Sequence, residues 1–119
     1  GHAAGDGLLC EVASRMQAAL DEGQILARIG GDEFLALLPS QGAEKTEATI
    51  EAVLANVSSA PYPVDGTSLV QIGVTAGFAC YPEDATDVTE LHVRADRALY
   101  AAKKAGKGFG TRYVPSLAA

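Results

Sequence analysis

The segment Gly30-Gly31-Asp32-Glu33-Phe34 lies between two apolar runs, Ile25 to Ile29 and Leu35 to Leu38. Both runs have the composition of short strands, and adjacent glycines can adopt the positive φ values that a tight strand connection requires. The segment therefore predicts a β-hairpin. Its tip carries two neighbouring carboxylates.

The carboxylates of Asp32 and Glu33 indicate a ligand at this tip. Two like charges side by side repel each other unless a metal ion or a set of donors offsets them. Gly30 and Gly31 leave their backbone N–H groups open to the phosphates of a ligand. The tip thus suits a metal-bound nucleoside triphosphate, and the alternative interpretation is a solvated acidic turn.

Composition excludes several other functions. The 119 residues suffice for one domain, and a hydrophobic content of 48% is ordinary for a globular protein. The net charge of −6 argues against a surface that binds nucleic acid. Cys10 and Cys80 lack metal-site spacing, so we expect two buried, reduced thiols. No stretch is long and apolar enough to span a bilayer, which predicts a cytoplasmic domain without membrane contact.

The hydrophobic pattern predicts three helices and an antiparallel sheet. Leu8, Val12 and Met16 repeat at helical spacing, and Asp87 with Glu90 forms a capping box before the last helix. The predicted helices cover about residues 6–20, 42–57 and 87–105, and the predicted strands cover 25–29, 34–38, 70–81 and 109–114. Residues 62–66 read as a loop or an edge strand. This order predicts an α+β fold with helices on an antiparallel sheet.

Four segments form a pattern in their order and spacing: Gly1 to Leu9, Arg28 to Leu35, Gly73 to Pro82 and Ala95 to Lys103. The first reads Gly-His-Ala-Ala-Gly-Asp-Gly-Leu-Leu, the second contains Gly-Gly-Asp-Glu-Phe, and the last reads Ala-Asp-Arg-Ala-Leu-Tyr-Ala-Ala-Lys. All four resemble motifs of the GGDEF family, the diguanylate cyclase domains. The resemblance implies the palm-like, ferredoxin-like architecture of nucleotidyl cyclases.

In that family a strand and a helix precede the first of these segments, and this chain has no counterpart for them. The strand lies in the middle of the family's sheet and supplies a metal ligand. We therefore expect residues 1–114 to be a partial GGDEF domain that lacks its first strand and helix, with residues 115–119 as a tail or linker. We expect this stretch alone to be inactive.

The resemblance assigns roles to four residues of the hairpin tip and the first helix. Asp32 and Glu33 are implied to bind Mg²⁺ or Mn²⁺ and to act in catalysis. Asp6 is implied to accept hydrogen bonds from the guanine base, and Leu9 is implied to form an apolar wall of the same pocket. The alternative for Asp6 is a helix N-cap.

The chain also departs from the family at the basic end and before the hairpin. Lys103 matches a lysine that contacts phosphate, although a lysine there also suits the helix dipole. Lys107 stands where the family often has arginine, so it supplies charge without a bidentate fork, and Gly108 replaces the usual asparagine. Asp21 and Gln24 replace an Arg and Asp pair that binds product in many relatives. We therefore expect no inhibitory site there.

The activity implied by the resemblance is the condensation of two GTP molecules into cyclic di-GMP with release of pyrophosphate. Catalysis would use a homodimer in which each subunit holds one GTP, and sensory or phosphodiesterase domains would be attached. One alternative is an inactive module that binds GTP and regulates a neighbouring domain. Another is a purely structural dimerisation unit. The intact Asp32-Glu33 pair favours the enzyme.

Overall fold

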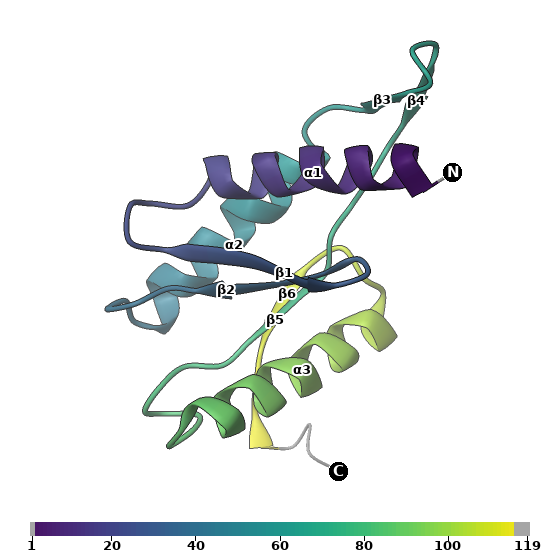
Figure 1. Cartoon of the computed structure of the whole chain (residues 1–119). Helices are drawn as coiled ribbons and strands as arrows, with labels where there is room; N and C mark the ends of the chain where they lie inside the picture. Colours follow the sequence, from purple (N-terminus) through teal and green to yellow (C-terminus); the bar gives the residue numbers. More distant parts are fainter. Residues whose placement is uncertain (1, 116–119) are drawn as a thin grey trace.

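The computed structural model describes residues 2–115 of the chain and combines helices with short sheets (Figure 1). The elements follow the order α1 (His2–Ala18), β1 (Ile25–Gly30), β2 (Glu33–Leu37), α2 (Ala43–Ser58), β3 (Tyr62–Val64), β4 (Ser68–Val70), β5 (Ala76–Phe78), α3 (Val88–Ala105) and β6 (Gly110–Arg112). The predicted α+β class is confirmed. Residues 116–119 of the predicted tail lie outside the described residues.

The strands β1 and β2 form the predicted antiparallel hairpin. Arg28 is paired with Phe34 and Gly30 with Glu33, and the register shifts between Arg28 and Gly30. Side chains alternate between the two faces of a strand. Leu26 and Phe34 turn to one face and pack against the buried core.

The core lies between α1, the end of α2 and the hairpin. Val12 and Met16 of α1 form a buried cluster with Val57 of α2 and Tyr62 of β3. Val57 and Tyr62 have no exposed surface at all. Burial of apolar side chains from α1, α2, β3 and both strands of the hairpin therefore fixes α1 and the hairpin relative to each other.

Arg15 joins α1 to the C-terminal end of α2. Its Nη1 donates to the carbonyl oxygens of Val57 at 3.3 Å and Ala60 at 2.5 Å, and its guanidinium lies 3.7 Å from the centre of the Tyr62 ring. In return, Asn56 Nδ2 donates to the Arg15 carbonyl at 2.6 Å. The last carbonyls of a helix lack intrahelical partners, so Arg15 satisfies groups that α2 leaves open.

Helix α1 begins at His2, earlier than the predicted start near Asp6. A glycine in a helix interior costs about 1 kcal/mol, and burial of Val12 and Met16 on the same helix outweighs the cost of Gly5 and Gly7. Asp6 therefore lies inside the helix, and its interpretation as an N-cap is wrong.

The two cysteines differ in their surroundings. Cys80 is buried as predicted, whereas Cys10 is exposed on α1, so its predicted burial is wrong. Cys10 lies on the side of the helix away from the Val12 and Met16 stripe, because residues 10, 12 and 16 do not share one helical face.

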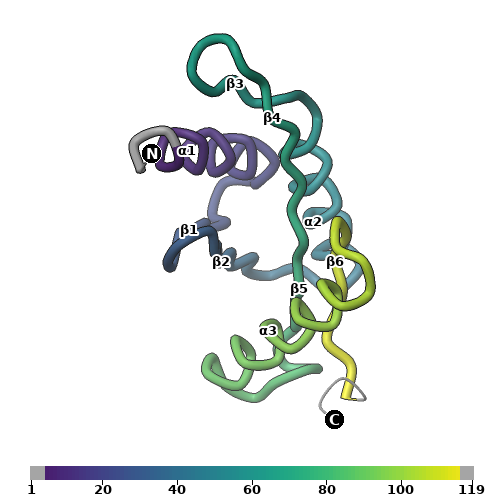
Figure 2. Tube along the Cα trace, turned by 90° about the vertical axis from the view of Figure 1, so that its right-hand side faces the viewer, coloured from purple at the N-terminus to yellow at the C-terminus, as the bar shows by residue number. Residues whose placement is uncertain are grey.

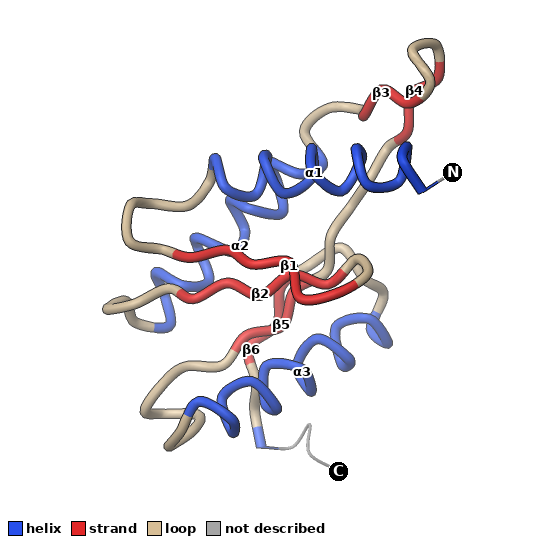
Figure 3. Tube along the Cα trace, viewed as in Figure 1, coloured by secondary structure: helices blue, strands red, loops and turns tan. Residues whose placement is uncertain are grey.

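The predicted strand over residues 70–81 is interrupted. Only β4 and β5 are strands in this region, and residues 71–75 between them form none (Figure 3). Ile72 and Val74 pack against the core while Gln71 and Gly73 are exposed. An extended segment with one buried side shows the same alternation as a strand, so the pattern indicates burial and does not require a paired neighbour.

Pairing directions also differ among the three two-stranded sheets. The pair β1-β2 is antiparallel as predicted, and β3 and β4 also pair antiparallel. The predicted antiparallel arrangement is wrong for β5 and β6, which run parallel. Figure 2 shows residues 71–75 running through the middle of the molecule, with the hairpin on one side and β6 on the other. Within residues 2–115, no helix is long and apolar enough to cross a bilayer.

Helix α3 starts and ends at the predicted signals. The Asp87 carboxylate accepts from the Glu90 N–H at 2.8 Å, and the Glu90 carboxylate accepts from the Thr86 N–H at 2.9 Å. Gly106 follows the last helical residue. The first contact satisfies a backbone donor that the first turn of the helix leaves open, and the second holds the residue before the N-cap.

Small residues let α3 approach β5 closely. Ala98 and Ala102 are buried, and Gly77 of β5 lies against the helix backbone. A Cβ on Gly77 would lie 2.5 Å from the Ala95 carbonyl oxygen and 2.6 Å from the Leu99 Cα. Backbone atoms cannot rotate away as a side chain can. Glycine at this position is therefore a packing requirement.

Asp84 anchors the loop before α3 to β6. Its carboxylate accepts from Arg112 Nε at 2.8 Å, Arg112 Nη2 at 3.1 Å and the Cys80 N–H at 2.8 Å. Burial alone raises the pKa of the Asp84 carboxyl. The hydrogen bonds from Arg112 and Cys80, with the charges of Arg112 and Arg94, outweigh this and hold the pKa below its ordinary value.

We expect Gly77→Ala to lower the free energy of unfolding by about 3 kcal/mol, because the added methyl group forces β5 away from α3. Urea denaturation followed by circular dichroism measures the loss. Gly73→Ala is the matched control: its Cβ would meet nothing within 4 Å, and both changes restrict the unfolded chain equally. Similar stabilities of the two variants would contradict the packing requirement.

We expect Asp84→Asn to lower the free energy of unfolding by about 2 kcal/mol at pH 7, because charged hydrogen bonds are lost. A carboxyl whose pKa is lowered in the folded state stabilises the fold at pH values above its unfolded-state pKa, near 3.9 for Asp. This stabilisation disappears as the pH falls through the folded-state pKa. The difference in the free energy of unfolding between the parent and Asp84→Asn should therefore shrink below about pH 4. Urea titrations from pH 7 to pH 2 test this, and a constant gap would rule it out.

Candidate functional site

The hairpin tip presents Asp32 and Glu33 to solvent. Gly31 has φ +52°, a left-handed conformation that glycine adopts without strain, and Asp32 follows it in the turn. Glu33 is the first residue of β2. Both acidic residues are exposed, so a ligand can reach them without rearrangement of the core.

Arg28 connects this tip to α1. Its Nε donates to the Gly31 carbonyl oxygen at 2.7 Å, and its Nη1 lies 3.9 Å from Asp6 Oδ1. Leu9 is half-buried, three residues after Asp6, so the two side chains lie on one side of the helix. The structure therefore brings Asp6 and Leu9 to the same edge of the molecule as Asp32 and Glu33.

Lys103 lies in the last turn of α3 and Lys107 lies just beyond the helix, and both are exposed. Lys107 has φ +64° and its N–H donates to the Ala102 carbonyl at 3.1 Å, which continues the turn beyond the helix. The Gly108 N–H donates to Thr75 Oγ1 at 2.8 Å. Thr75 was not predicted from the sequence, because its position in an alternating run carries no signal for a loop contact.

The structure does not bring these lysines onto the hairpin. In Figure 1 the start of α1, the hairpin tip and the end of α3 lie on one side of the molecule. Figure 2, turned by 90°, shows α1 and the hairpin together and the end of α3 apart from them. Among residues 2–115, the ion pairs include neither lysine.

Positive charge is concentrated around α3 in a chain that is acidic as a whole. Residues 94–112 hold six of the nine lysines and arginines but only one of the 15 acidic residues. Arg94 and Arg112 contact Glu90 and Asp84. Lys103 and Lys104 lie in the last turn of α3. This end of the molecule can attract an anion that the overall charge of −6 would repel.

The donor set at the tip fits a hard divalent cation with a phosphate ligand. Mg²⁺ is commonly held by one or two carboxylates together with substrate phosphates and water. Asp32 and Glu33 supply two carboxylates of this type. Within residues 2–115, no three His, Cys, Asp or Glu side chains gather to form a complete metal site. The tip alone therefore offers part of a coordination shell.

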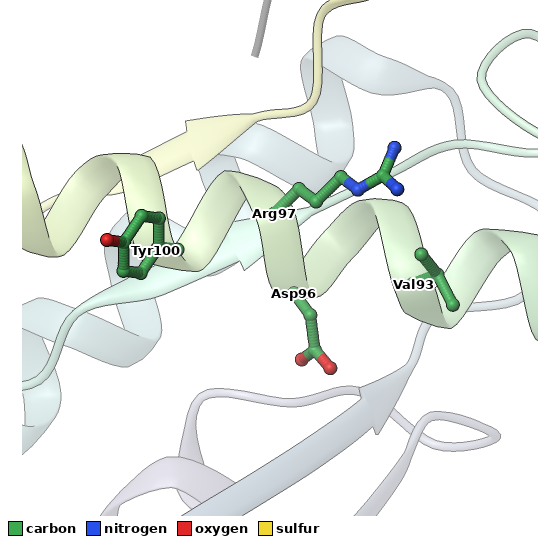
Figure 4. Close-up of a pocket in the computed structure, with 4 residues that line it drawn as sticks. All are labelled: Val93, Asp96, Arg97 and Tyr100. Atoms are coloured by element: carbon green, nitrogen blue, oxygen red, sulfur yellow. The ribbon is translucent and has the colours of Figure 1, made fainter. Parts of the chain in front are cut away.

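A hollow on α3 is a separate feature (Figure 4). It is lined by Val93, Asp96, Arg97 and Tyr100, which all come from one face of the helix. None of the predicted site residues lines it. We therefore place the candidate site at the hairpin tip and the neighbouring part of α1.

Asp21 and Gln24, at the positions where we expect no inhibitory site, form a hydrogen-bonded turn before β1. The Asp21 N–H donates to Gln24 Oε1 at 2.7 Å, and Gln24 Nε2 donates to Gln41 Oε1 at 2.9 Å. The Gln24 side chain is thus engaged by its own chain on both its oxygen and its nitrogen.

Comparison with known proteins gives matches over nearly the whole chain. The family described as diguanylate cyclase, GGDEF domain, matches residues 1–108. The chain is 37% identical over 119 residues to the probable diguanylate cyclase DgcE of Escherichia coli (strain K12). That alignment covers 100% of this chain and 11% of DgcE, so the chain spans a small part of this relative.

Solved structures agree with this match. The structure of the GGDEF domain of TpbB from Pseudomonas aeruginosa has a TM-score of 0.90 at 33% identity, covering 99% of this chain and 69% of that one. The GGDEF domain of DgcB from Caulobacter crescentus, in complex with c-di-GMP, has a TM-score of 0.83 at 32% identity, covering 94% of this chain and 66% of that one.

Proposed function

Since this chain belongs to the GGDEF family of diguanylate cyclase domains, we propose that the protein containing it condenses two GTP molecules into cyclic di-GMP and releases pyrophosphate. One observation carries the proposal: the exposed pair Asp32 and Glu33 stands on a hairpin tip that Arg28 ties to Asp6. An acidic pair beside a base-binding position is what a metal-bound nucleotide requires.

Asp32 and Glu33 would hold Mg²⁺ or Mn²⁺ with the triphosphate. The bound ion would offset phosphate charge and make the ribose 3′-hydroxyl a better nucleophile toward the α-phosphate of the second GTP. The backbone of Gly30 and Gly31 has no side chain to hinder the phosphates. The tip would thereby set the position of the triphosphate on the protein.

Asp6 and Leu9 would select the base. A carboxylate accepts from both the N1–H and the exocyclic N2–H₂ of guanine, a donor pair that adenine does not present. Leu9 is half-buried one helical turn away and offers apolar surface to the ring. Asp6 is 69% exposed in its side chain, so it can change partners from Arg28 to a base.

Lys103 and Lys107 would neutralise the far end of the triphosphate. Lysine carries its charge on a long, flexible stem, so exposed lysines can reach an anion that approaches the end of α3. Because the proposed reaction joins two nucleotides, the proposal includes a facing homodimer in which each subunit holds one GTP. The proposal also includes a cytoplasmic location and attached sensory or phosphodiesterase domains.

The alternative function is a module that binds GTP without turning it over and regulates a neighbouring domain. Lys107 and Gly108 favour this alternative, because a lysine lacks the bidentate fork of arginine and glycine has no side chain for a polar contact. Asp32 and Glu33 would then hold a nucleotide for signalling alone.

We expect Asp32→Ala to lower the rate of GTP condensation by the intact natural protein about 100-fold or more, because a metal ligand is lost. Chromatography of the product formed from GTP and Mg²⁺ measures the rate. Glu51→Ala is the control, since Glu51 is an exposed carboxylate on α2, and its rate should stay within about twofold.

Each outcome of this experiment decides between the functions. A rate for Asp32→Ala within a few fold of the parent would reject the role of Asp32. An intact protein that binds GTP by calorimetry but forms no product would establish the regulatory alternative. A protein that neither binds GTP nor turns it over would support the remaining alternative, a purely structural dimerisation unit.

We also expect no binding of cyclic di-GMP at Asp21 and Gln24. Asp21 is negative where a guanidinium would be needed, and the Gln24 side chain already contacts Asp21 and Gln41. Calorimetric titration of the intact protein with cyclic di-GMP tests this. Tight binding that Asp21→Ala preserves or improves, and that Asp32→Ala leaves unchanged, would reveal a product site at this surface.

A further inference from the structure

Arg28 reaches both halves of the candidate site from one side chain. It is the last residue of β1 with regular pairing before the register shifts, and it pairs with Phe34 across the hairpin. Its guanidinium donates from Nε to the Gly31 carbonyl at 2.7 Å and lies 3.9 Å from the Asp6 carboxylate through Nη1. No other side-chain hydrogen bond of residues 2–115 reaches the turn of the hairpin.

We propose that Arg28 is a positioning residue that sets the direction of Asp32 at the hairpin tip. The proposal rests on the proposed function, because Asp32 is a metal ligand only if that function holds. Arg28 itself would touch neither the metal ion nor the reacting atoms. It would act through the backbone of Gly31.

The covalent geometry of the peptide unit gives this contact its effect. The carbonyl of Gly31 and the N–H of Asp32 belong to one planar peptide group and point in opposite directions. Holding the carbonyl oxygen therefore fixes the direction of the Asp32 N–H as well. It also restricts the position of the Asp32 Cα, from which the side chain with its carboxylate projects.

Glycine makes the restraint necessary. Gly31 has φ +52° and no side chain, so its backbone can rotate into other conformations at little cost. The tip projects from the hairpin, and a Cβ on Gly31 would meet nothing within 4 Å. The pairing of Gly30 with Glu33 closes the turn on either side, and the hydrogen bond from Arg28 is the side-chain restraint on the peptide group between them.

The two contacts of Arg28 differ in strength. The hydrogen bond to Gly31 is short, whereas the ion pair with Asp6 is long and involves a carboxylate that is 69% exposed. Exposed ion pairs contribute little. Loss of Arg28 should therefore disturb the metal-binding tip more than the base pocket, and the two effects are separable in kinetics.

The shape of the guanidinium favours arginine over lysine at this position. Arginine donates from Nε and Nη in a rigid plane, so it can hold Gly31 while Nη1 faces Asp6. Lysine keeps the positive charge but has a single donor group on a flexible stem. Arg28→Lys therefore separates the charge of Arg28 from its geometry.

The test compares Arg28→Ala, Arg28→Lys and the control Lys45→Ala in the intact natural protein. Lys45 is an exposed cation on α2, so its loss changes net charge equally. We expect Arg28→Ala to lower kcat about tenfold to 100-fold and to raise the Mg²⁺ concentration for half-maximal rate several fold, because a small displacement of a catalytic group is costly. KM for GTP should change less than about threefold, and Arg28→Lys should remain impaired.

Three results would overturn the proposal: Arg28→Ala indistinguishable from Lys45→Ala, full recovery of the rate in Arg28→Lys, or a loss confined to KM. The first result would show that Arg28 has no specific role. The second would show that only its positive charge matters, and the third would show that it acts on the base pocket and not on the metal-binding tip.

A second readout does not depend on activity. Backbone ¹⁵N relaxation of the intact natural protein reports order at Gly31 and Asp32. We expect order parameters at these two amides to fall from about 0.85 to below about 0.6 in Arg28→Ala and to stay unchanged in Lys45→Ala. An intact protein that forms no product would refute the proposed function and leave this result standing. Unchanged order parameters at Gly31 and Asp32 in Arg28→Ala would refute the positioning role of Arg28.

Discussion

The contact between α1 and the C-terminal end of α2 is the constraint from which the candidate site follows. Arg15 fills the open carbonyls at the end of α2 and lies over the ring of Tyr62, whose hydroxyl donates to the Val57 carbonyl at 2.6 Å. A cation that covers an aromatic face while it donates to carbonyls ties helix ends more firmly than apolar contact alone. The same cluster receives Leu26 and Phe34 from the hairpin. This shared core fixes the position of α1, which carries Asp6, relative to the hairpin, which carries Asp32.

Charge is divided between two parts of the chain. The hairpin tip and α2 carry carboxylates, whereas most cations lie in residues 94–112. A nucleoside triphosphate needs both kinds of surface, since a metal ion requires anionic ligands and the remaining phosphate charge requires cations. The two surfaces lie on different elements, α3 being held to β5 through Gly77 rather than through the α1 core.

Local signals predicted most elements well. The hairpin follows from paired glycines between apolar runs, and the start of α3 follows from Asp87 and Glu90, because turn and cap chemistry acts within a few residues. Several predictions were wrong where burial or tertiary contacts decide the structure. The start of α1 depends on burial further along the helix, Cys10 is exposed, and residues 71–75 are extended with one side buried without forming a ladder. The parallel pairing of β5 with β6 brings together segments more than 30 residues apart.

The sequence by itself determined the class of fold, the acidic hairpin tip and the family, because these rest on short motifs whose residues are neighbours along the chain. It also indicated Asp6, Leu9, Lys103 and Lys107 through the resemblance. Only the tertiary structure decided that Asp6 lies within reach of the tip while the two lysines do not touch it. It also decided that Arg28 holds the carbonyl of Gly31. The physical reason is that a side-chain contact between a helix and a hairpin depends on how both pack on a shared core, and no spacing along the chain encodes that distance.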